Sequence, residues 1–177
     1  MRDAPGAARG SIPCTLAAFD RLSAEILRSG RALRFRAHGG SMWPLVRDGD
    51  VLLVQPVDPA AVRTGDVVLC GNRSGRVVAH RVVRIEDSPD GRRFTVQGDA
   101  VAQPDGKFPP AQLYGRVAAI ERGAARIAMD RPVMKLLGRA AALRSARSLG
   151  RGLWFRAARA LARRLPALSN SWHRRLV

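Results

Sequence analysis

The stretch that decides the fold is residues 66–85, which read DVVLCGNRSGRVVAHRVVRI. Two runs rich in Val, at residues 66–70 and 77–85, flank the turn-forming segment 71–75. Val is favoured in strands because its branched side chain packs well on a pleated surface, whereas Gly, Asn and Ser are favoured in turns. The stretch therefore predicts two short strands separated by a turn.

Similar short strands are predicted on both sides of this stretch. Residues 33–38 alternate apolar and polar side chains, which is the pattern of a strand with one buried face. Further strand candidates are residues 51–54, 92–97 and 113–120, separated by turn-rich pieces such as 47–50 and 88–91. Many short strands with Gly and Asp turns predict a mainly β (α+β) class, built on a compact antiparallel β domain.

A helix is predicted before the β domain. Residues 1–14 read as a leader, Thr15 is a candidate helix cap, and Gly30 is a candidate stop. Between them, apolar residues recur at three- and four-residue steps: Leu16, Phe19, Leu22 and Ile26. This spacing predicts an amphipathic helix of about four turns.

The chain becomes helical again after residue 123, over 132–147 and then over 153–165. We therefore divide it into a leader with an amphipathic helix (1–30), a β domain (31–121) and an Arg-rich helical tail (122–177). The tail holds 14 of the 31 Lys and Arg residues but only one of the 14 Asp and Glu residues, so most of the net charge of +17 belongs to it.

The basic tail bears on possible partners. In residues 153–165, Trp154 and Leu161 face one way and arginines the other, which predicts binding to an anionic membrane surface. The alternative is a helix packed on the β domain with a solvated arginine face. A nucleic-acid partner is not expected, because the front of the chain is nearly balanced in charge and holds no helix-turn-helix or aromatic stacking motif.

Composition excludes several other classes. Cys14 and Cys70 are the only cysteines and do not form a CxxC motif, which favours two reduced thiols over a disulfide scaffold or a zinc site. No secretory signal and no run of about 18 apolar residues occurs, so no transmembrane segment is predicted. We expect a cytoplasmic protein, peripheral on the membrane if the tail binds lipid.

Three short segments carry candidate catalytic side chains, and the first contains Ser41. It follows Gly39 and Gly40, which let the backbone pass close to another segment and free nearby N–H groups. A serine at such a turn can hold its Oγ toward a cleft, and its own N–H can point at a developing oxyanion. Taken alone, the segment is more typical of an ordinary turn serine.

The second and third segments contain His80, Asp99 and Asp105. His80 lies between valines on one strand face, where partial desolvation favours the neutral imidazole that acts as a base. A carboxylate can fix the tautomer of such a histidine and stabilise the imidazolium that forms during catalysis. Taken alone, a histidine hydrogen-bonded in the core and a turn aspartate remain the simpler interpretations.

Together the ordered segments resemble the type I signal peptidases, which are relatives of the self-cleaving repressors. The resemblance is to the histidine-containing branch of the endoplasmic reticulum, archaea and some Gram-positive bacteria, and covers about residues 30–121. It is carried by Gly40-Ser41-Met42-Trp43-Pro44, Gly49-Asp50, Gly65-Asp66-Val67-Val68, Ala79-His80-Arg81-Val82-Val83, Gly98-Asp99, Asp105 and Leu113-Tyr114-Gly115-Arg116-Val117.

The resemblance implies a serine endopeptidase that cleaves leader or signal peptides through an acyl-enzyme. Ser41 would be the nucleophile and His80 the base, where other branches use a lysine. Asp99 and Asp105 match the two acidic positions, and which of them assists His80 is left open with a slight preference for Asp105. The peptide or preprotein substrate would bind as an extended strand along a sheet edge, and no metal or cofactor is implied.

Two departures from the family keep alternatives open. Members usually carry a transmembrane helix before the serine, and Ala100 stands where an Asn commonly follows the Asp. The alternatives are a peptidase dedicated to one leader peptide, an inactive relative that binds peptides, and a nucleic-acid binder that uses the basic tail.

Overall fold

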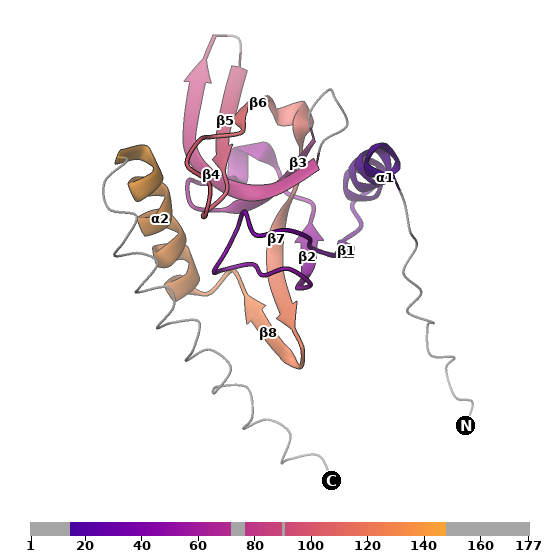
Figure 1. Ribbon diagram of the computed structural model, residues 1–177. Coiled ribbons are helices and arrows are strands. Elements are labelled where there is room, and N and C mark those ends of the chain that lie inside the picture. Colours follow the sequence, from indigo (N-terminus) through magenta and orange to yellow (C-terminus); the bar gives the residue numbers. More distant parts are fainter. Residues whose placement is uncertain (1–14, 72–76, 90, 148–177) are drawn as a thin grey trace, which may run out of the picture.

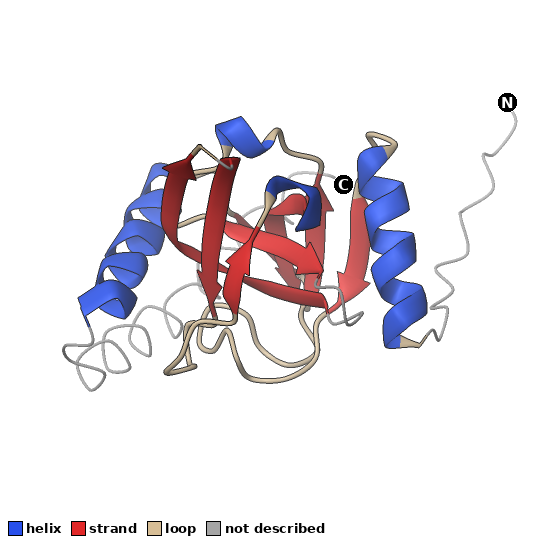
Figure 2. Cartoon of the chain, turned by 90° about the horizontal axis from the view of Figure 1, so that it is seen from above, coloured by secondary structure: helices blue, strands red, loops and turns tan. Residues whose placement is uncertain are grey.

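The computed structural model describes residues 15–71, 77–89 and 91–147. Within these residues, eight strands form one antiparallel sheet that lies between two α-helices (Figure 1, Figure 2). The elements are α1 (Leu16–Arg28), β1 (Leu33–Arg36), β2 (Val51–Gln55), η1 (Pro59–Ala61), β3 (Val67–Gly71), β4 (Val77–Ser88), β5 (Gly91–Gln97), β6 (Gly106–Phe108), η2 (Pro110–Gln112), β7 (Leu113–Arg122), β8 (Ala125–Ala128) and α2 (Pro132–Arg147). The mainly β class predicted from the strand pattern is confirmed.

The two strands predicted from residues 66–85 pair with each other as β3 and β4. Their register runs antiparallel from Val67 opposite Arg81 to Gly71 opposite Val77, and it places His80 opposite Val68. The strand order across the sheet is β1-β2-β7-β3-β4-β5-β6, with β8 added to β7. The β3–β4 pair is therefore a central part of the sheet.

Strand β7 joins the two halves of the sheet. Residues 116–121 pair with β2, residues 113–116 pair with β3, and residues 119–122 pair with β8. A Cβ on Gly115 would lie 2.5 Å from the Gln55 carbonyl oxygen, so only glycine lets the backbones approach this closely. Strand β7 thus connects β2, which follows the segment that carries Ser41, with β3, the neighbour of the His80 strand.

Apolar side chains fill two cores, one on each face of β3. Val67 and Leu69 belong to the core that also contains Met42, whereas Val68 and Cys70 belong to the core that contains Phe94. Successive side chains of a strand point to opposite faces, and here both faces are covered. For this reason β3 is buried along its whole length.

Helix α1 begins after Thr15, whose side chain accepts a hydrogen bond from the Ala18 N–H at 3.3 Å, as the sequence predicts. The predicted apolar face is buried only in part: Phe19 and Ile26 pack against the core, whereas Leu16 is 72% exposed and Leu22 is 43% exposed. Ser23, Ala24 and Leu27 are buried. The small residues let the helix approach the sheet, and burial of Leu27 stabilises the contact by about 2 kcal/mol.

A polar contact fixes the orientation of α1 on the sheet. The Tyr114 hydroxyl on β7 donates a hydrogen bond of 2.8 Å to Asp20. The two groups lie directly over Gly71, where an added Cβ would clash with both. Burial and the nearby Asp20 carboxylate raise the pKa of Tyr114 to about 12, so the phenol remains a donor over the physiological range.

The sheet continues beyond the boundary predicted at residue 121. After Gly123, in a left-handed turn with φ of 56°, strand β8 folds back on β7. Helix α2 then follows with the bounds predicted for it, 132–147, and packs against β4. β6 and β8 were not predicted from the sequence. The tail thus begins as part of the β domain.

The rest of the tail, including the predicted helix over 153–165 and its membrane contact, lies outside the described residues. No helix in the described ranges is both long and apolar enough to cross a membrane. Cys14 also lies outside these ranges.

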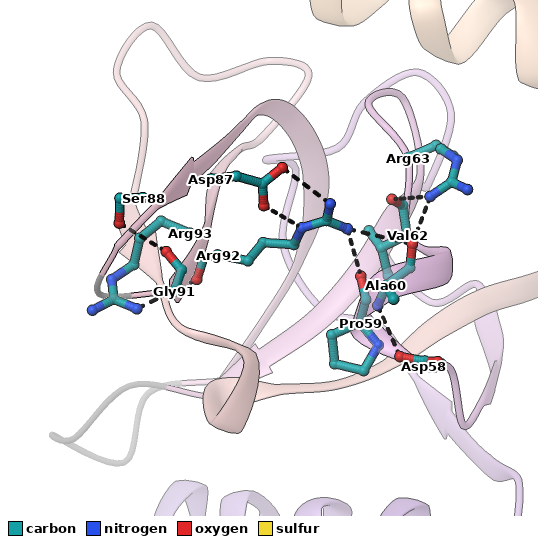
Figure 3. Close-up of polar contacts among 10 residues, drawn as sticks. All are labelled: Asp58, Pro59, Ala60, Val62, Arg63, Asp87, Ser88, Gly91, Arg92 and Arg93. Atoms are coloured by element: carbon teal, nitrogen blue, oxygen red, sulfur yellow. Dashed lines mark hydrogen bonds and ion pairs between the residues drawn. The ribbon is translucent and has the colours of Figure 1, made fainter.

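The β4–β5 hairpin is tied back to η1 by one arginine (Figure 3). The Arg92 guanidinium donates to both carboxylate oxygens of Asp87, at 2.7 and 3.1 Å, and to the carbonyl oxygens of Pro59 and Ala60 at 3.4 and 3.3 Å. Arg63 holds the other side of the same turn through the carbonyls of Ala60 and Val62. These contacts order the rim of the sheet without entering either core.

The buried thiol of Cys70 gives a test of this packing. Burial, with a smaller contribution from the Asp105 charge, raises its pKa from 9.0 to about 12. The thiolate is the reactive form, so in a Cys14→Ser variant at pH 8 we expect iodoacetamide to modify Cys70 only after unfolding in urea. Mass spectrometry measures the modification, and equal rates in the folded and unfolded protein would contradict the burial.

Because the folded state holds the Cys70 thiol proton more tightly than the unfolded state, the free energy of unfolding should fall as the pH rises from about 9 toward 12.

Candidate active site

The alternation of β4 turns His80 toward a largely dry environment. Val78 and Val82 share its strand face and pack with the core that contains Val68, the residue opposite His80. The His80 side chain is only 7% exposed. A buried polar ring needs hydrogen-bond partners, and both of its nitrogens have one.

Ser41 lies in the loop between β1 and β2, at the end of a glycine turn. Gly39 adopts a φ of 92°, and its N–H donates to Asp48 Oδ1 at 2.8 Å. The next residue after the serine, Met42, is 4% exposed and belongs to the core that also contains Val67 and Leu69, here called the first core. Ser41 is therefore held between a constrained turn and a buried side chain.

Ser41, His80 and Asp105 form one hydrogen-bonded chain. Ser41 Oγ lies 2.8 Å from His80 Nε2, and His80 Nδ1 lies 2.5 Å from Asp105 Oδ2. A carboxylate oxygen accepts, so Nδ1 carries the hydrogen and Nε2 is left with the lone pair that accepts the Ser41 proton. This is the tautomer that a general base for a serine requires.

The two candidate acids have different partners. Asp105 contacts the histidine, whereas Asp99 accepts two hydrogen bonds from the guanidinium of Arg81, at 2.7 Å from Nε and 2.6 Å from Nη2. The Arg81 and Asp99 side chains are each 3% exposed. The structure thus brings Asp105 to His80. Asp99 instead forms a buried ion pair with Arg81, the residue that follows His80 in β4.

Gly98 connects this ion pair with the reacting side chains. A Cβ at this position would lie 2.6 Å from the Ser41 carbonyl oxygen and 3.2 Å from His80 Nε2, so there is no space for any side chain. The N–H of Ala100 donates to the same carbonyl at 2.8 Å. The segment 98–100 therefore packs directly on Ser41, and the absence of a side chain at Gly98 sets how close it comes.

The backbone before Ser41 supplies the candidate oxyanion donors. The Gly39 N–H is already bonded to Asp48, so it is occupied within the turn. Within the described part of the chain, the N–H groups of Gly40 and Ser41 donate to no other group. Of the three residues singled out from the sequence, Gly40 and Ser41 are thus free to donate and Gly39 shapes the turn.

A second buried ion pair, not foreseen as part of the site, holds the far end of the same loop. Arg122, the last residue of β7, donates to both oxygens of Asp50 at 2.9 and 2.6 Å and to the Leu45 carbonyl at 2.9 Å. Asp50 is 4% exposed and also accepts from the Arg47 N–H at 2.7 Å. The Gly49-Asp50 pair was the one local signal, but its partner lies 72 residues away.

Two strand edges near Ser41 are open to an extended chain. Among the residues that the structure describes, β1 pairs only with β2, and residues 77–80 of β4 pair with β3, while the β5 pairing starts at residue 81. Four partly buried apolar side chains from these segments pack on the same core: Phe35, Ala37, Val77 and Ala79. Among the described residues a separate hollow lies beside α1, between Asp20 and Tyr114, but no member of the Ser41 chain lines it.

The arrangement can perform proton transfer and nucleophilic attack with side chains alone. No cluster of three or more His, Cys, Asp or Glu side chains placed to hold a metal ion occurs within the described ranges. Comparisons with models of known protein families, with curated proteins and with solved structures found no match.

The Asp50–Arg122 pair gives a test of how the loop is held. We expect Arg122→Leu to lower the free energy of unfolding by about 3 kcal/mol, because it leaves the Asp50 carboxylate buried without a counter-ion. Arg116→Leu on the same strand is the matched control, since its contact with Asp66 is 3.5 Å long and the Arg116 side chain is 44% exposed. There the loss should stay within about 1 kcal/mol. Urea unfolding measures both, and equal losses would show that the loop does not depend on Arg122.

Proposed function

We propose that this protein is a serine endopeptidase in which Ser41 is the nucleophile, His80 the general base and Asp105 the acid that orients His80. The observation that carries the proposal is the continuous hydrogen-bonded chain from Ser41 Oγ through the imidazole to Asp105. The three residues come from distant parts of the sequence, and a serine, a histidine and a carboxylate in this order define the hydrolytic triad on unrelated folds.

The reaction would proceed in two halves. Ser41 Oγ attacks the scissile carbonyl carbon while His80 Nε2 takes its proton, and the Gly40 and Ser41 N–H groups stabilise the oxyanion. The tetrahedral intermediate expels the amine, which receives that proton from His80, and leaves an acyl group on Ser41. Water then attacks the ester with His80 again as the base, releasing the acid and restoring the Ser41 hydroxyl.

Asp99 has a supporting role in this proposal. Its carboxylate is fully engaged by Arg81, so it contributes through the position of residues 98–100 and not through the imidazole. Such a residue is a positioning residue, because it touches neither the peptide nor the reacting atoms.

The substrate class that we propose is a leader or signal peptide bound as an extended strand. The resemblance to the histidine branch of signal peptidases supports it, and so do the open edges of β1 and of residues 77–80 beside Ser41. Backbone groups on such edges form hydrogen bonds with an added strand, and alternate side chains of the peptide contact the protein side chains beneath it. The side chains near these edges are apolar, namely Phe35, Ala37, Val77 and Ala79. Such a surface favours small apolar side chains before the cleavage site.

The Ser41–His80 pair gives the direct test. We expect Ser41→Ala and His80→Ala each to lower kcat for peptide cleavage by about 10⁴-fold or more, while the circular dichroism spectrum stays unchanged. Candidate leader peptides incubated with each variant and analysed by mass spectrometry provide the measurement. A His80→Ala protein that cleaves at the wild-type rate would contradict the assignment of His80 as the general base. A folded wild-type protein that binds these peptides without cleaving them would favour a relative that only binds peptides.

The two acids can be separated by a second pair of variants. Asp105→Asn should lower kcat by about 10⁴-fold with little change in stability, because the amide supports the wrong imidazole tautomer. Asp99→Asn should instead lower the free energy of unfolding by about 3 kcal/mol, because it leaves Arg81 buried without its counter-ion. Kinetics and urea unfolding on the same preparations check both expectations, and the reverse pattern would exchange the roles of the two acids.

A further inference from the structure

Helix α2, the last helix in the described residues, lies against the strand that carries His80 (Figure 1). Gly138 marks the closest approach, since a Cβ there would lie 2.6 Å from the Gly65 carbonyl oxygen and 2.9 Å from Arg81 Nη1. The residue on the other side is also glycine, and a Cβ on Gly65 would lie 2.8 Å from the Arg139 backbone nitrogen. The helix backbone therefore rests on the backbone of the turn that precedes β3, with no side chain between the two glycines.

This contact lies directly over a buried charge. Arg81 Nη1 donates to the Gly65 carbonyl at 2.7 Å, and Nε and Nη2 each donate to Asp99. Both side chains of the ion pair are 3% exposed. The backbone around Gly138 covers this pair, and a buried pair is strong only while water is kept away and every donor has an acceptor.

The same ion pair adjoins His80 directly and Ser41 through Gly98. Arg81 follows His80 in β4, and Asp99 follows Gly98, whose Cα packs against the Ser41 carbonyl and His80 Nε2. The Asp99 N–H also contacts the sulfur of the buried Met42 at 3.4 Å. A displacement of Arg81 would therefore be passed to both ends of the Ser41–His80 hydrogen bond.

We propose that α2 is a positioning element of the active site, and that Gly138 and Gly65 are the positioning residues through which it holds Arg81. This inference rests on the proposed peptidase function and extends it to a segment outside the residues that resemble signal peptidases. His80 and Arg81 point to opposite faces of β4, so α2 contacts the residue that follows His80 and not His80 itself.

The substitution Gly138→Ala in the full chain tests the inference. Alanine is the better helix former, so helix propensity alone would leave the protein as stable or more stable. The added Cβ instead meets Gly65 and Arg81, and we expect kcat for peptide cleavage to fall about 10-fold or more while KM changes less than about twofold. An unchanged kcat in a folded Gly138→Ala protein would overturn the inference.

Two further variants keep the result interpretable. Leu136→Ala changes a side chain on the same helix that is 68% exposed, and it should leave kcat unchanged. Ala142→Gly weakens the helix at a fully buried position without adding any atom, and it should lower kcat in the same direction as Gly138→Ala. If Gly138→Ala does not fold, Ala142→Gly decides, and a wild-type kcat in that variant would reject the role of α2.

A spectroscopic readout separates failure of this inference from failure of the proposed function. The Nδ1–H proton of His80, bonded to Asp105, should give a strongly downfield NMR signal that shifts or broadens in Gly138→Ala and not in Leu136→Ala. If the wild-type chain cleaves no peptide but the His80 signal changes in Gly138→Ala, the coupling between α2 and His80 is supported and the peptidase function is contradicted. An unchanged His80 signal overturns the coupling whether or not the chain is active.

Discussion

The buried ion pair between Arg81 and Asp99 is the contact on which the site depends. Removing both charges from water costs several kcal/mol, and such a pair persists only when its geometry is good and its other donors are satisfied. Here two hydrogen bonds join the carboxylate, and a third joins the Gly65 carbonyl. The pair therefore fixes residues 98–100 against β4, and those residues lie on Ser41. A register change in this region would separate the serine from its base.

Successive side chains of β4 point to opposite faces of the sheet, and the two faces have different roles. His80 points to the side where Ser41 and Asp105 meet it, and Arg81 points to the side that α2 covers. A sheet with cores on both faces allows adjacent residues to be desolvated at the same time, because each face has its own covering layer. Hydrogen bonds and ion pairs are stronger in such surroundings than in water, so both the chemical and the supporting contacts gain in strength from the same packing.

The loop that carries Ser41 is held by long-range contacts at both ends. Met42 anchors the start in the first core, and the pair of Asp50 with Arg122 anchors the end. A serine on a loop with only local hydrogen bonds would sample many positions, whereas a loop fixed at two points keeps its Oγ within reach of His80. This preorganisation is what hydrolysis by a serine requires, since small misplacements of the reacting atoms cost large factors in rate. It supports the proposal of a peptidase over that of a module that only binds peptides.

The local elements could be predicted from the sequence, because each depends on side chains close together in the chain. The Val-rich strands 67–71 and 77–88, the Thr15 cap and the helix over 132–147 all follow from spacing and turn residues. The sequence order of Ser41, His80 and the two acids also indicated the site, but not which acid serves the histidine. Only the tertiary structure decided that Asp105 contacts His80 while Asp99 pairs with Arg81, that α1 buries Leu27 and exposes Leu16, and that α2 belongs to the site. The physical reason is that these contacts join residues far apart in the sequence, and the pairing of the strands in one sheet brings them together.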